Sequence, residues 1–150
     1  MRSILVFLHL FGQVAWLGGA LAAMTIGIAS KREQKDSLGT TVRFQSAIYR
    51  TLIAPGALIV VVTGILLTLK MYNQATAVGL SRGLMAMQGF GILGALIILV
   101  HTLPKSSTLA RLEPSGGTAV MFEALRGKVM VSGMIASMLG MLSLVAAALR

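Results

Sequence analysis

Four long apolar runs, separated by charged or turn-rich stretches, give the chain its main pattern. They cover residues 3–29, 52–69, 83–103 and 129–149. A helix that rises about 1.5 Å per residue needs about 20 apolar residues to cross about 30 Å of hydrocarbon, and each run approaches or exceeds that length. The pattern therefore predicts an all-α membrane protein, an antiparallel four-transmembrane-helix bundle. Because no polar block is long enough to fold alone, residues 1–150 are expected to form one domain.

Helix boundaries follow from the residues that flank these runs. Residues 40–50 and 118–128 continue into the second and fourth runs without a proline, so helices two and four are expected to project beyond the bilayer. Pro55 and Gly56 lie inside the second run and predict a kink there. Pro104 predicts that the third helix ends near residue 103. The first run continues to Ala29, past the usual length of a signal-peptide apolar region, which favours a retained helix.

Composition and charge support this assignment and orient it. Hydrophobic residues make up 56% of the 150 residues and charged residues only 11%, whereas about a quarter of a soluble domain is charged. The first and third loops hold the larger share of the basic residues: Lys31, Arg32, Lys35, Arg43, Arg50, Lys105, Arg111, Arg126 and Lys128. The opposite side holds Arg2, Lys70, Arg82 and Arg150. Cytoplasmic loops carry the basic excess, so both termini are predicted outside a bacterial-type inner membrane. The net charge of +9 then faces the lipid bilayer, and no nucleic-acid partner is expected.

One stripe of the first helix combines polar and small residues. At about 100° per residue, its members fall within about 120° of one another: His9, Gly12, Gln13, Trp16, Gly19, Ala20, Ala23 and Gly27. Polar groups at membrane depth point to the bundle interior, so this stripe is expected to face protein or a cofactor. Gly12 and Gly19 flank Trp16 and permit either a close neighbouring helix or the edge of a flat ligand.

The same stretch carries a family resemblance. HLFGQVAWLGG at 9–19 resembles the first-helix pattern His-x-x-Gly-x-x-x-Trp-x-Gly-Gly of the copper-resistance CopD-like membrane proteins and of a small, uncharacterised four-helix family related to them. RTLIAP at 50–55 and TG at 63–64 are similar to the second helix of that group, so the resemblance covers about half of the chain. The HemJ-type protoporphyrinogen oxidases, which bind haem b, share the His, Gly and Trp spacing. They continue the first helix with an Arg and a further His and carry a functional Lys early in the third helix. This chain has LAAMTIGIAS and Arg82 there, so the oxidase activity is not expected.

His9 is the candidate ligand. A neutral imidazole is a good axial ligand for haem iron and a fair one for copper or zinc. The alternative is a buried histidine that hydrogen-bonds across helices to a hydroxyl, amide or carbonyl. The only other histidine, His101, is expected at the headgroup level of the opposite face, so a haem within one chain would have a single His ligand. The residues expected to shape the pocket are Gly12, Gln13, Trp16 and Gly19.

Methionines suggest a second metal hypothesis. Met130, Met134, Met138 and Met141 recur at helical spacing in the fourth helix, where soft thioethers would suit Cu(I). Methionine equally fills irregular apolar gaps. The same helix has a separate face of small residues that suits close packing: Ser132, Gly133, Ala136, Gly140, Ser143 and Ala147. The chain has no cysteine, which excludes thiolate metal sites, iron–sulfur clusters and disulfides.

The distribution of acidic residues argues against an enzyme or a proton-coupled transporter. Glu33, Asp36, Glu113 and Glu123 all fall in predicted cytoplasmic segments, so no carboxylate lies at membrane depth. No Gly-rich phosphate loop, HExxH motif or Ser, His, Asp set is present. We therefore expect a small membrane protein that binds haem b or a metal through His9 and serves in electron transfer. The alternatives are an accessory or scaffold subunit in a homo-oligomer or larger membrane complex, and a copper-handling protein.

Overall fold

The computed structural model describes residues 2–30, 37–74 and 82–148, and this part of the chain contains helices and no strands. The first helix is α1 (Arg2–Ala29). The second helical stretch consists of α2 (Leu38–Ile48), the π-helical turn η3 (Tyr49–Ile53) and α3 (Ala54–Gln74). The third consists of α4 (Arg82–Leu96), the π-helical turn η4 (Ile97–Thr102) and α5 (Leu103–Leu109). A short 3₁₀ turn, η5 (Gly116–Thr118), leads into α6 (Ala119–Ala148).

Four helical stretches are long and apolar enough to cross a membrane. They are Arg2–Ala29, Leu38–Lys70, Gly83–Leu109 and Gly116–Ala148. Large apolar side chains cover their outer surfaces, and Phe7, Val14 and Val100 are 65%, 72% and 72% exposed. A surface of this kind suits lipid and not water, because soluble monomers rarely expose large contiguous apolar patches. The predicted set of four apolar helices is confirmed.

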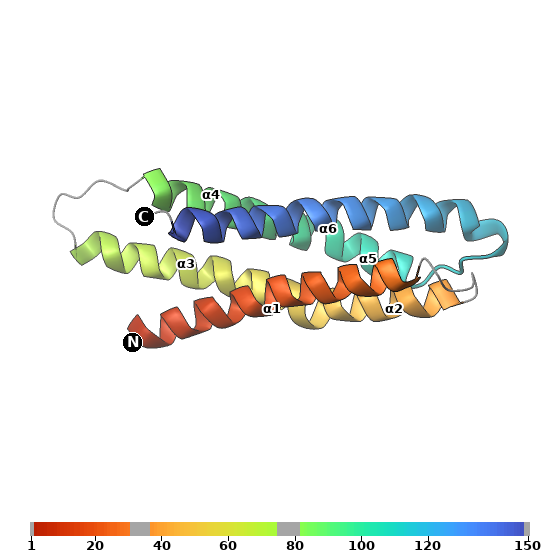
Figure 1. Ribbon diagram of the computed structural model, residues 1–150, viewed down its shortest axis with the longest axis horizontal. Helices are drawn as coiled ribbons and strands as arrows, with labels where there is room; N and C mark the ends of the chain where they lie inside the picture. The colour runs from red at the N-terminus through yellow and green to blue at the C-terminus, as the bar shows by residue number, and fades with distance from the viewer. Residues whose placement is uncertain (1, 31–36, 75–81, 149–150) are drawn as a thin grey trace.

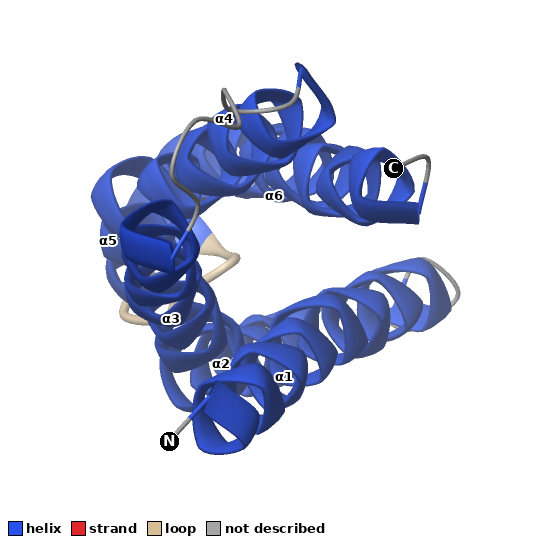
Figure 2. Cartoon of the chain, turned by 90° about the vertical axis from the view of Figure 1, so that its left-hand side faces the viewer, coloured by secondary structure: helices blue, strands red, loops and turns tan. Residues whose placement is uncertain are grey.

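The helices pack mainly in two pairs, α1 on α3 and α4 on α6, and α3 against α4 joins the pairs. Figure 1 shows that α1 begins and α6 ends at the same end of the molecule. Figure 2, which views the helices from that end, shows α1, α3, α4 and α6 following one another around the molecule. Sequential neighbours are therefore also spatial neighbours, as is usual for helices joined by short loops.

Trp16 lies at the centre of this packing and is fully buried. A Cβ at Gly94 of α4 would be 3.0 Å from its indole ring, and one at Gly140 of α6 would be 3.4 Å from it. These two glycines therefore make room for the ring where α1 meets the α4–α6 pair. The predicted small-residue face of α6 is buried from Ser132 to Ser143, which confirms that it packs against other helices.

Helices two and four extend beyond the apolar runs, as the sequence predicts. Backbone helix runs without interruption from residue 38 to residue 74, and α6 begins at Ala119. The third helix differs from its prediction. It does not end near residue 103 but continues through Pro104 to Leu109.

Both intrahelical prolines follow a π turn. The amide N–H of Ala54, just before Pro55, bonds to the carbonyl five residues back, and so does that of Leu103, just before Pro104. A proline in a regular α-helix clashes with the carbonyl four residues earlier and supplies no N–H. The wider π turn relieves this conflict, and the hydroxyl of Thr102 donates to the Ile97 carbonyl at 3.1 Å. The helix therefore passes through Pro104, where the sequence pattern suggested an end.

Candidate functional site

His9 is half-buried on α1 and is hydrogen-bonded to α3. Its Nδ1 lies 2.9 Å from Oγ1 of Thr63. The Thr63 hydroxyl also lies 2.5 Å from the carbonyl of Ile59, one turn earlier on the same helix. The hydroxyl has one proton to donate. When it donates to the Ile59 carbonyl, Nδ1 of His9 donates to the hydroxyl and Nε2 keeps its lone pair for a ligand. When it donates to Nδ1, Nε2 carries the imidazole proton instead.

His9 lines a small, partly open cavity between four helices. The cavity has a volume of about 30 Å³. About 10–15 Å³ of such volume is enough for one water molecule, whereas cofactor pockets usually measure about 300–1,000 Å³. The space therefore suits a water molecule or a single ion. Its lining residues are His9 of α1, Val60, Val61, Gly64 and Ile65 of α3, Met87, Gln88, Gly91 and Ile92 of α4, and Ser143 of α6.

Polar groups from α4 and α6 complete the cavity. The Ser143 hydroxyl donates to the carbonyl of Met87 at 2.9 Å. The Gln88 amide donates to the hydroxyl of Thr68 on α3. These bonds fix two polar side chains of the wall and leave the serine oxygen able to accept a further hydrogen bond. Together with His9 they are the polar side chains of a lining that is otherwise apolar.

Gly64 is the glycine that gives the imidazole of His9 its space. A Cβ at that position would be 3.3 Å from Cε1 of His9. Gly12 and Gly19, which the sequence places around the site, have a different role. A Cβ at Gly12 would be 2.9 Å from the carbonyl oxygen of Gly56, and one at Gly19 would be 2.9 Å from Ile53. Gly12 therefore brings α1 close to α3, Gly19 brings it close to η3, and neither glycine lines the cavity.

Gln13 and Trp16 lie on the same buried face of α1, as predicted, but point towards α6 and α4. The amide nitrogen of Gln13 donates to the carbonyl of Gly140 over 3.4 Å. Within the described part of the chain, Oε1 of Gln13 and Nε1 of Trp16 are buried and have no hydrogen-bond partner. A buried acceptor and a buried donor one turn apart on one helix are a suitable pair for a bridging water molecule. The buried face of α1 therefore carries polar groups in addition to His9, but neither Gln13 nor Trp16 lines the cavity.

The methionine row of α6 lies on the outer surface. Met130, Met134, Met138 and Met141 are 54%, 47%, 63% and 60% exposed. The structure therefore places them towards lipid and away from His9. Met87 of α4 lines the cavity instead. Hydropathy gave no reason to single it out, because its position at the cavity depends on how α4 is rotated against α1 and α3.

His101 is separate from this site. It is exposed at the end of η4, and the Lys105 ammonium donates to its Nε2. The described residues contain no cluster of three or more His, Asp or Glu that could hold a metal ion. A metal at His9 would therefore need thioether, hydroxyl, amide, carbonyl or water ligands beside the imidazole.

The volume of the cavity can be compared with the space that a haem needs. A cavity of about 30 Å³ is roughly a tenth of the smallest usual cofactor pocket. A haem does not fit among these helices as they are packed. No protein-family model matches the chain, and no curated protein or solved structure matches it. The resemblance to CopD-like proteins stays a prediction, and a function has to follow from the site itself.

Proposed function

We propose that the chain is an antiparallel four-helix protein of a bacterial-type inner membrane with both termini outside. The four apolar helices and the common end at which α1 begins and α6 ends support this arrangement. The orientation rests on the excess of basic residues in the first and third loops.

Within this bundle, we propose that His9 binds a single soft metal ion such as Cu(I) through Nε2. The observation that carries the proposal is the hydrogen bond between His9 and Thr63, because donation from Nδ1 to the Thr63 hydroxyl would orient the ring and leave Nε2 without a proton. Metal-binding histidines are usually oriented by such a bond from the other ring nitrogen. The size of the cavity and the presence of Met87 in its lining favour one ion over haem b. A copper ion held there would suit electron transfer or copper handling.

The second candidate is an accessory or scaffold subunit. Its support is the close approach of α1 to α3 at Gly12 and Gly56 and of α1 to η3 at Gly19, because these contacts use the small residues of the α1 stripe for helix packing. In that case His9 and Thr63 simply join two helices. Replacing His9 with Leu would then lower stability modestly and change no metal content or absorption spectrum.

Copper titration and absorption spectra of the same samples separate these candidates. The full chain is purified in mild detergent as wild type, His9→Ala and His101→Ala, the last being a matched control at the exposed histidine. Stoichiometric Cu(I) binding that is lost only in His9→Ala would support the metal site. A Soret band lost only in His9→Ala would show haem binding and would require the helices to separate. No metal and no band in any sample would favour the scaffold role.

A further inference from the structure

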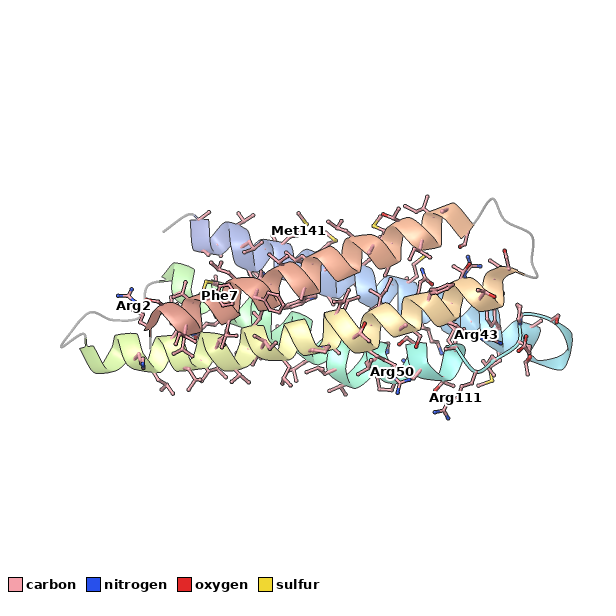
Figure 3. The ribbon with its side chains drawn as sticks, turned by 90° about the horizontal axis from the view of Figure 1, so that it is seen from below. Arg2, Phe7, Arg43, Arg50, Arg111 and Met141 are labelled. Atoms are coloured by element: carbon pink, nitrogen blue, oxygen red, sulfur yellow. The ribbon has the colours of Figure 1, made fainter. Side chains whose placement is uncertain are left out.

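Basic side chains gather along the contact between the second and third helical stretches, at the end of the molecule away from His9. Here α2 packs against α5, and η3 also contacts α5. Arg43 of α2 binds Glu113 at 3.0 Å, which holds the segment after α5 against one face of α2. Arg50 lies two helical turns beyond Arg43 and so continues that face. Figure 3 shows Arg43, Arg50 and Arg111 along the same side of the molecule.

The charges at this contact are not balanced by carboxylates. Arg43 is paired with Glu113, but no ion pair within the described residues involves Arg50, Lys105 or Arg111. The ammonium of Lys105 donates to Nε2 of His101, since an ammonium group can only donate. This bond holds Lys105 beside η4. We call the group formed by Arg50, His101, Lys105 and Arg111 the basic seam.

An exposed apolar side chain adjoins the basic seam. Val100, the residue before His101, is 72% exposed. It belongs to a stretch long and apolar enough to cross a membrane. A soluble anion would use only the charges of the seam. A phospholipid would use both parts, the charges for its phosphate and the apolar side chains for its acyl chains.

We propose that the basic seam binds the headgroup of an anionic phospholipid. The guanidinium groups of Arg50 and Arg111 offer paired donors that match phosphate oxygens, and Lys105 adds a point charge. The acyl chains then lie along the exposed apolar surface that includes Val100. Such a lipid would join the second and third helical stretches at the level where η3 meets α5. This proposal does not depend on a metal at His9.

Native mass spectrometry of the full chain in detergent tests the proposal, with dioleoyl-phosphatidylglycerol and dioleoyl-phosphatidylcholine as the titrated lipids. The wild type is expected to bind phosphatidylglycerol at least about tenfold more tightly than phosphatidylcholine. Arg50→Gln with Lys105→Gln should weaken phosphatidylglycerol binding by about tenfold or more, because each basic group near a membrane contributes substantially to the attraction. Arg126→Gln with Lys128→Gln removes the same charge from α6 and should change binding by less than about twofold.

Several results would overturn the proposal. Equal loss in the two double variants would show a general effect of net charge. Equal affinity of the wild type for both lipids would mean that the seam does not recognise the headgroup. Displacement of the lipid by excess inorganic phosphate would identify a site for a soluble anion. If the first double variant does not fold, as judged by circular dichroism, Arg111→Gln replaces it and should weaken binding by about fivefold; unchanged binding would then reject the site.

Discussion

Replacing Gly56 with Ala should separate α1 from α3. A Cβ at Gly56 would be 2.7 Å from the backbone nitrogen of Trp16 and 2.8 Å from the carbonyl oxygen of Gly12. Ordinary contact for a Cβ begins at 3.4 Å, so the first distance falls short by about 0.7 Å. Both neighbours are backbone atoms, which cannot rotate away as a flexible side chain could. The helices must therefore move apart along their contact, and overpacking of this kind costs about 1–3 kcal/mol.

Gly18→Ala is the matched control, because a Cβ at Gly18 has no atom within 4 Å. It should leave stability unchanged or raise it by up to about 1 kcal/mol, since alanine favours helix over glycine. The free energy of unfolding is measured by circular dichroism during titration of the detergent-solubilised protein with sodium dodecyl sulfate. Gly56→Ala should lower it by about 2 kcal/mol or more relative to Gly18→Ala. Equal stability of the two variants would refute the close packing of α1 on α3.

Three further predictions concern individual side chains. Thr63→Val removes the acceptor for Nδ1 of His9, so it should cost about 0.6–2 kcal/mol of unfolding free energy in the same titration. It should also weaken Cu(I) binding about 10–100-fold in competition with a chromophoric chelator; unchanged affinity would argue against tautomer control. Met87→Leu should weaken Cu(I) binding while Met138→Leu, on the outer surface, should not, and the reverse order would place the metal on α6. Thr102→Val removes the hydroxyl that lies 2.9 Å from the Ser132 hydroxyl and so joins η4 to α6, and it should lower the free energy of unfolding by about 1 kcal/mol. A stabilised protein would contradict this buried hydrogen bond.

The sequence predicted the features that depend on periodicity. The stripe on α1 is buried at Gly12, Gln13, Trp16, Gly19 and Ala23, as its spacing requires for an interior face. The small residues of α6 likewise face inward. Both predictions succeed because a helix in lipid turns its polar and small residues towards its neighbours and its large apolar residues outward.

The partners across helices could not be predicted from the sequence. That Thr63, Met87 and Ser143 meet at His9's cavity depends on the rotation and the axial shift of each helix against the next. Many rotations satisfy the same hydropathy pattern. The course of the helix through Pro104 was also missed, because proline usually marks a helix end. Nothing in the local sequence distinguishes a proline that ends a helix from one whose ring is accommodated by a preceding π turn.

The two π turns also determine which way the residues that follow them in the same helical stretch face. Each turn contains one residue more than an α-helical turn needs, so removing a residue from η3 would rotate α3 by about 100° relative to α2. Thr63 would then no longer face His9, although the composition and hydropathy of the helix would hardly change. The presence of one residue in η3 therefore determines whether Thr63 can orient the imidazole of His9. A bundle of this kind can gain or lose its polar site by a single-residue insertion or deletion, without altering any residue that lines it.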